Sequence, residues 1–67
     1  MRAGLINIGM KEGDKILISP ELTHLSTWKE GTIIDVEKNP FVGIVISAKT
    51  TDGNIYFEKE SFFKAVS

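Results

Sequence analysis

Cysteine is absent from this 67-residue chain, and histidine occurs once. Without cysteine no disulfide can form, and a single imidazole with no thiolate beside it does not complete a tetrahedral zinc site. A chain this short buries only about 60% of the surface that it exposes when unfolded, so its core supplies little net stability. The sequence therefore predicts either a compact fold with few free strand edges or a homo-oligomer.

An excess of basic charge and a long apolar run are also missing. Eight Lys and Arg stand against nine Asp and Glu, the sequence pI is about 5.7, and the charges are interspersed. Nucleic-acid binders usually carry a basic excess on one face, so this balance disfavours that class while leaving room for a local patch. No apolar stretch approaches the ~20 residues of a membrane span. With no signal-peptide pattern and no cysteine, we expect a soluble, cytoplasmic domain.

The first nine residues are set apart from the rest. Met10-Lys11-Glu12-Gly13-Asp14 resembles a chain start in its own right. We therefore expect residues 1–9 to be a loosely attached extension and residues 10–67 to form the domain.

Short segments with period-two alternation of apolar residues dominate the chain, separated by Gly, Pro and Asp-Gly. A first helical turn is expected where Ser19 precedes Pro20 and Glu21, and a second over residues 60–63. The five predicted strands cover residues 14–19, 31–37, 41–50, 54–59 and 64–66.

This order of elements predicts an all-β fold, a small SH3-like five-strand barrel that is partly open. Ile16 and Ile18 are expected inside, as are Ile34 and Val36 of the second strand. An open antiparallel sheet in a homodimer is the structural alternative.

The turn at Asp52-Gly53 is expected to set the register of the last hairpin. Asp-Gly between two alternating segments favours a two-residue type I′ turn. This turn would place Tyr56 opposite Lys49 on the outer face, where Phe41 and Val45 would join it. The residues that it would place in the interior are Ile46, Ala48, Ile55 and Phe57.

The preceding hairpin is less regular. This hairpin joins the strands predicted over residues 31–37 and 41–50. Their apolar residues share one face only if the loop near Lys38-Asn39-Pro40 has an odd number of residues. We expect a five-residue loop or a bulge near Gly43.

Two stretches resemble known families. Gly13-Asp14-Lys15-Ile16-Leu17-Ile18 and the later Glu30-Gly31-Thr32-Ile33-Ile34-Asp35-Val36 resemble the paired strands of KOW-type barrels in ribosomal and transcription-elongation proteins. The whole chain is similar to short stand-alone bacterial SH3-like proteins, some of which are labelled transcriptional regulators. The resemblance implies a small barrel and, as one function, nucleic-acid or transcription-associated binding.

Aromatic side chains are the main candidate binding residues. Trp28 could anchor a partner at a groove rim, or it could instead cover one end of the barrel. An outer cluster with Phe41 and Tyr56 would mark a partner site or a dimer interface, unless the first loop or the N-terminal segment covers it. Phe62 and Phe63 cannot both face inward, so one of them is expected at the surface.

Catalysis has little support in the sequence. His24 has no nearby nucleophile, Asp35 and Glu37 are expected on a solvated exterior, and phosphate-loop and Ser-elbow patterns are missing. We expect no catalytic residues, no metal and no cofactor.

The leading hypothesis is a non-enzymatic module that binds a protein partner or itself. The alternative is a nucleic-acid-binding or transcription-associated regulatory protein whose lysines contact phosphates. An enzyme assembled at an oligomer interface is a third class. The partner-binding residues are predicted to be Trp28, Phe41, Tyr56, Phe62 and Lys49, and the phosphate-contacting residues Lys15, Lys29, Lys38 and Lys49.

Overall fold

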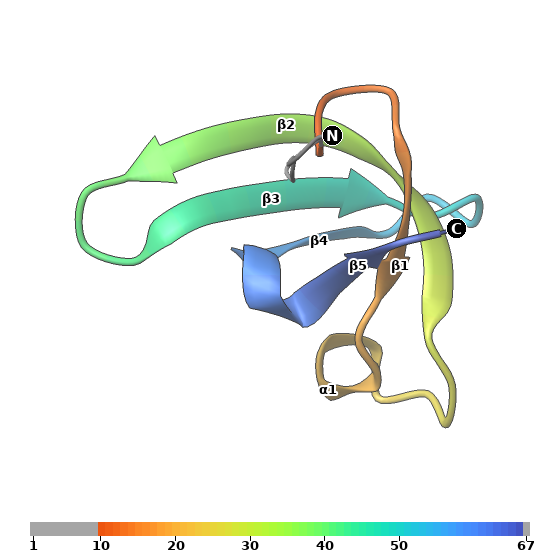
Figure 1. Cartoon of the computed structure of the whole chain (residues 1–67). Coiled ribbons are helices and arrows are strands. Elements are labelled where there is room, and N and C mark those ends of the chain that lie inside the picture. The colour runs from red at the N-terminus through yellow and green to blue at the C-terminus, as the bar shows by residue number, and fades with distance from the viewer. Residues whose placement is uncertain (1–9, 67) are drawn as a thin grey trace, which may run out of the picture.

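A five-stranded antiparallel sheet carries the fold in the computed structural model, which describes residues 10–66 (Figure 1). The strand order is β4-β3-β2-β1-β5. The all-β prediction with five strands is confirmed, whereas no ladder joins β4 to β5 among residues 10–66, so closure into a barrel is not shown. The extension expected over residues 1–9 lies outside the described residues. The elements are β1 (Lys15–Ile18), α1 (Pro20–Thr23), β2 (Lys29–Asn39), β3 (Gly43–Lys49), β4 (Ile55–Lys59), η2 (Glu60–Phe62) and β5 (Phe63–Ala65).

The long curved strand β2 connects two parts of the sheet (Figure 1). Its first residues pair with β1, and from Thr32 onward it pairs with β3. The core lies on the inner side of this curve and takes side chains from four strands. Its buried members are Ile16, Ile18, Ile33, Ile46, Ala48 and Phe63, which confirms the inward placement expected for Ile16, Ile18, Ile46 and Ala48.

The β3–β4 hairpin differs from the predicted two-residue turn. Thr50 and Asn54 form the last backbone pair, with the Thr50 N–H donating to the Asn54 carbonyl at 2.9 Å. Three residues therefore make the loop, and Gly53 closes it with a φ of +94° and an N–H···O bond of 3.0 Å to Thr50. A type I turn followed by a left-handed glycine is the usual form of such a loop. The pairs observed are Lys49 with Ile55, Ala48 with Tyr56, and Ser47 with Phe57.

The Thr50 side chain explains why the longer loop forms. Its hydroxyl donates to the Asp52 carboxylate and accepts the Asn54 N–H at 3.3 Å. One additional loop residue moves every side chain of β4 to the other face of the sheet. The predicted interior positions of Ile55 and Phe57 are therefore wrong, and so is the outer position of Tyr56, which packs against the core.

A bulge in β2 overturns a second expectation. The pairing with β3 shifts between Ile33 and Asp35, so that Ile34 is the additional residue. Such an insertion inverts the alternation of side chains beyond it. Ile33 is consequently buried and Val36 packs against the core, whereas Ile34, predicted to face inward, is exposed.

The β2–β3 loop has three residues, between the paired Asn39 and Gly43. The odd number is confirmed, whereas the expected five-residue loop is not found, and the register shift of this ladder lies between Ile33 and Asp35 and not near Gly43. The Asn39 amide oxygen accepts the N–H groups of Phe41 at 2.8 Å and Val42 at 3.2 Å, and Gly43 has a φ of +93°. This side-chain bonding satisfies the loop backbone.

The two predicted helical turns are confirmed as α1 and η2. The Ser19 hydroxyl accepts the Glu21 N–H at 3.0 Å, Pro20 occupies the first turn, and His24 ends α1 with a φ of 65°. Among the described residues, neither helical turn has the length and apolar character that a membrane crossing needs.

Gly31 lies where β2 changes partner from β1 to β3, and a side chain there would be crowded. A Cβ at this position would lie 3.1 Å from both the Ile18 Cδ1 atom and the Lys49 carbonyl oxygen. We expect Gly31→Ala to lower the free energy of unfolding by about 1–3 kcal/mol, as overpacking does, measured by urea denaturation. The neighbouring exposed control Glu30→Ala should change it by less than about 0.5 kcal/mol. Equal stability of Gly31→Ala and the parent chain would contradict this account of the close packing.

The Asp52–Thr50 contact should make the hairpin sensitive to acid. The Thr50 hydroxyl is the largest cause that lowers the pKa of Asp52 in the folded chain. A lowered folded-state pKa stabilises the fold above the unfolded-state pKa of about 3.9, and this contribution is lost as pH falls through the folded-state pKa. The parent chain should therefore unfold at a higher temperature than Asp52→Asn at neutral pH. The difference between the two unfolding temperatures should narrow below about pH 4. A gap that stays constant into strong acid would rule out this linkage.

Candidate functional site

Exposed and half-buried apolar side chains gather around β4, from its outer face and that of β3 to η2. We call this the apolar patch; it consists of Val42, Val45, Ile55, Phe57 and Phe62. Phe57 is 69% exposed and Ile55 is 55% exposed. All patch members except Ile55 line a groove of about 420 Å³, together with Glu58 and Lys59. An apolar centre with charged neighbours has the composition of a binding surface.

The strand register produces this exposure. Phe57 is paired with Ser47, whose small side chain does not cover the ring, and Ile55 is paired with Lys49. Phe62 ends η2, where it is half-buried against the core, and the Lys59 ammonium lies 5.9 Å from its ring centroid. One wall of the groove, formed by Phe62, therefore packs against the core, while Phe57 on another wall is exposed to solvent.

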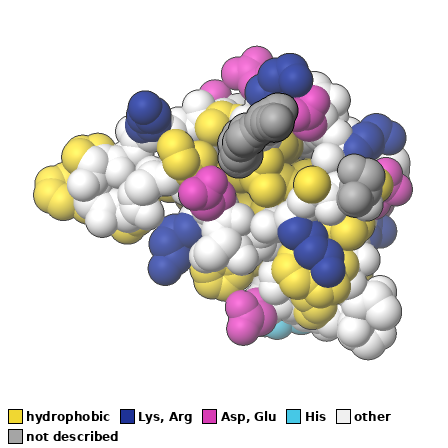
Figure 2. Space-filling view, in the orientation of Figure 1, with side chains coloured by type: hydrophobic (Ala, Val, Ile, Leu, Met, Phe, Trp, Pro, Cys, Tyr) yellow, Lys and Arg dark blue, Asp and Glu magenta, His cyan; other side chains and the backbone are white. Residues whose placement is uncertain are grey.

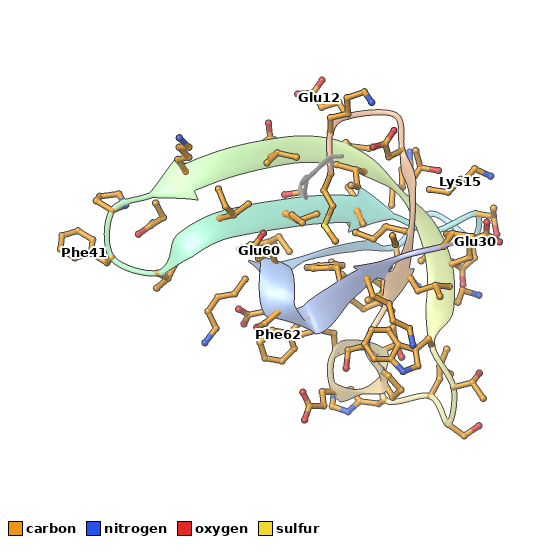
Figure 3. All side chains as sticks on the ribbon, viewed as in Figure 1. Glu12, Lys15, Glu30, Phe41, Glu60 and Phe62 are labelled. Carbon is orange, nitrogen blue, oxygen red and sulfur yellow. The ribbon has the colours of Figure 1, made fainter. Side chains whose placement is uncertain are left out.

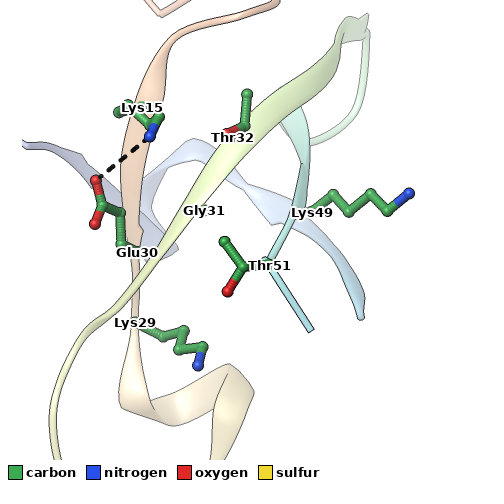
Figure 4. Close-up of a pocket in the computed structure, with 7 residues that line it drawn as sticks. All are labelled: Lys15, Lys29, Glu30, Gly31, Thr32, Lys49 and Thr51. Atoms are coloured by element: carbon green, nitrogen blue, oxygen red, sulfur yellow. Dashed lines mark ion pairs between the residues drawn. The ribbon is translucent and has the colours of Figure 1, made fainter. Parts of the chain in front are cut away.

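A second candidate site is a pocket of about 250 Å³ where β1, β2 and the end of β3 meet (Figure 4). Lys15, Lys29 and Lys49 line it, and Gly31 contributes no side chain. The Lys15 ammonium lies 4.0 Å from the Glu30 carboxylate, and Figure 4 shows Lys29 and Lys49 on either side of Thr51. Counting these charges, three lysines and one glutamate leave a net charge of +2. We call this site the lysine pocket.

The structure does not bring the predicted partner-binding residues onto one surface. Phe41 is 92% exposed at the tip of the β2–β3 hairpin, away from Phe62 (Figure 3). Trp28 is 37% exposed, and the Lys64 ammonium lies 4.4 Å from its ring centroid. Lys49 belongs to the lysine pocket, so of the predicted set only Phe62 lines the groove.

Phe57 and Ile55 are the patch residues that sequence reasoning assigned to the interior. The signal that could have found them is the polar run Thr50-Thr51-Asp52-Gly53-Asn54, which is long enough for a three-residue loop between paired ends. Pairing Ala48 with Tyr56 also fills the interior with an aromatic side chain. Both registers therefore satisfy the apolar pattern, and only the loop distinguishes them.

Polar groups elsewhere have structural or solvated positions. His24 is exposed, and its N–H donates to the Pro20 carbonyl at 2.8 Å, closing α1. Asp35 and Glu37 are exposed, as predicted. Within residues 10–66, no group of three or more His, Asp or Glu side chains is arranged to hold a metal ion. Figure 2 shows charges of both signs interspersed over one face, with apolar side chains reaching the surface at the hairpin tip.

Comparisons of the chain with protein-family models, with curated proteins and with solved structures give no match. The apolar patch and the lysine pocket are therefore the observations from which function is inferred.

Proposed function

We propose that this chain is a non-enzymatic binding module that recognises a protein partner through the apolar patch. The observation that carries the proposal is the exposure of Phe57 beside a groove whose wall includes Val45 and Phe62. Isolated apolar side chains are common on protein surfaces, whereas a contiguous apolar patch marks an interaction site. Aromatic side chains in such patches contribute much of the binding energy.

The arrangement of charge supports the same proposal. Glu58 and Lys59 border the groove, and Asp35 and Glu37 are exposed on β2, the neighbouring strand beyond β3. Interfaces commonly combine an apolar centre with a polar rim that sets orientation. Phe57 takes the role that the sequence had suggested for Tyr56. We include in this proposal that the chain is a relative of small bacterial SH3-like proteins and that it acts in the cytoplasm.

Replacing Phe57 should separate binding from folding. Because the ring is 69% exposed, Phe57→Ser should change the free energy of unfolding by no more than about 0.5 kcal/mol. Loss of a central aromatic contact of about 2 kcal/mol should reduce recovery of bound protein more than tenfold. The measurement is quantitative affinity capture with mass spectrometry.

Phe41→Ser is the matched control, because Phe41 is an exposed phenylalanine outside the patch. It should recover the same proteins as the parent chain. Equal recovery by Phe57→Ser and the parent chain would count against the apolar patch as the binding site.

A second candidate function, binding of single-stranded nucleic acid, is favoured by the lysine pocket. Its lysines come from three different strands yet line a single hollow, which gives a local basic site on a chain of net charge −1. Phosphates are bound by such clusters with strong dependence on salt. The resemblance of the β1 and β2 sequences to KOW-type strands supports the same candidate.

Salt titration tests this candidate. If the three pocket lysines contact phosphates, the logarithm of the binding constant for a single-stranded oligonucleotide should fall with log salt at a slope of about −2. Lys29→Ala with Lys49→Ala should flatten this slope, as measured by fluorescence anisotropy. Lys38→Ala is the control, because Lys38 lines a different hollow beside Pro40. No detectable binding at low salt would exclude this function.

A further inference from the structure

Strand β4 ends the sheet, and its backbone direction can be derived from the turn. The Thr50–Asn54 pair is hydrogen-bonded, with an N···O distance of 2.9 Å. Hydrogen-bonded and non-bonded pairs alternate along an antiparallel ladder. The next bonded pairs are therefore Ala48 with Tyr56 and Ile46 with Glu58. Consequently the N–H and C=O groups of Ile55, Phe57 and Lys59 point away from β3.

A side-chain hydrogen bond agrees with this assignment. The Lys59 N–H donates to the Glu58 carboxylate at 2.9 Å, as an N–H turned away from β3 can do. Among residues 10–66, no backbone hydrogen bond outside the ladders reaches Ile55 or Phe57. An edge of this kind is a template for a further strand.

The same residues also carry the exposed side chains. Ile55 and Phe57 have outward-pointing backbone groups, and their side chains lie on the outer face. A strand added beside β4 would therefore gain backbone hydrogen bonds and set its own side chains against both apolar side chains at once.

We propose that the occupant of this edge is a second copy of the same chain, paired antiparallel through β4 across a two-fold axis at Phe57. This inference rests on the proposed function, since it names the partner that the apolar patch recognises. In this register Phe57 faces Phe57 of the second copy, Ile55 faces Lys59 of the second copy, and Tyr56 faces Glu58 of the second copy. Each charged residue of β4 then faces an uncharged residue.

Charge and strand length select this register. A two-fold axis at Glu58 would place Glu58 opposite Glu58 of the second copy, and an axis at Lys59 would place Lys59 opposite Lys59 of the second copy. Like charges that face each other directly are destabilising. An axis at Ile55 or Tyr56 sets Lys59 against the loop of the second copy and leaves its backbone groups without a strand partner. Only the axis at Phe57 uses all three outward-pointing residues.

Self-pairing also suits the size of the chain. The chain has no cysteine for a disulfide, and its largest exposed apolar side chains on β4 lie beside an edge that no other strand of residues 10–66 pairs with. A two-fold contact is made by the same residues on both copies, so one pairing brings both sets of side chains into contact.

Disulfide trapping tests both the pairing and its register, because the chain has no cysteine of its own. Residues facing each other in a hydrogen-bonded pair have Cα atoms about 5.5 Å apart, within disulfide range. A mixture of Ile55→Cys and Lys59→Cys chains should give a disulfide-linked dimer under mild oxidation. Either variant alone should not, because its cysteines would be about 13 Å apart. Trapping that is no greater in the mixture than in either single variant would overturn the register.

Light scattering over a concentration series measures the association itself. We expect a dimer for the parent chain and for Ile55→Thr, and at least a tenfold weaker association for Ile55→Pro. Proline removes an N–H that points away from β3, so the fold should be retained, as checked by circular dichroism. If Ile55→Pro fails to fold, the trapping experiment decides.

The two proposals fail in different ways. A parent chain that stays monomeric at millimolar concentration, yet captures another protein in a Phe57-dependent manner, would overturn self-pairing and leave the binding module intact. A dimer that Phe57→Ser forms as readily as the parent chain, together with capture of other proteins that does not depend on Phe57, would overturn both.

Discussion

The hydroxyl group of Thr50 determines which face β4 presents to solvent. By bonding both the Asp52 carboxylate and the Asn54 N–H, it stabilises a loop of three residues. A loop one residue shorter would exchange the two faces of the following strand. The core would then receive Ile55 and Phe57, and the surface would receive Tyr56. The apolar patch and the inference about the β4 edge therefore depend on the loop that this side chain stabilises.

Strand β2 joins the two parts of the sheet through a close approach at Gly31 and a bulge at Ile34. It pairs with β1 at one end and β3 at the other, and the absence of a side chain at Gly31 allows close approach where the partner changes. Just beyond, the bulge at Ile34 reverses the alternation, so that Ile33 and Val36 both reach the interior. A curved strand with one bulge can thus direct side chains into the core on both sides of the bulge.

Much of this fold could be predicted from the sequence, because fold class depends on apolar periodicity. The alternation of Ile16 and Ile18 in β1, and the cap made by Ser19 and Pro20, are local signals and were predicted correctly. The register of the β3–β4 hairpin and the bulge in β2 were not predicted correctly. The first depends on a threonine side chain that bonds to the backbone, and the second on one additional residue in a strand, and apolar periodicity contains neither signal. The candidate site was missed for the same reason, because Phe57 fits an interior pattern equally well.

The face and the edge of β4 are physically linked. In an antiparallel strand, side-chain direction and backbone hydrogen-bond direction both alternate with period two. In the observed ladder Phe57 has its side chain on the outer face and its N–H and C=O pointing away from β3. The apolar surface and the unpaired backbone consequently coincide on the same residues, which is the combination that strand addition requires.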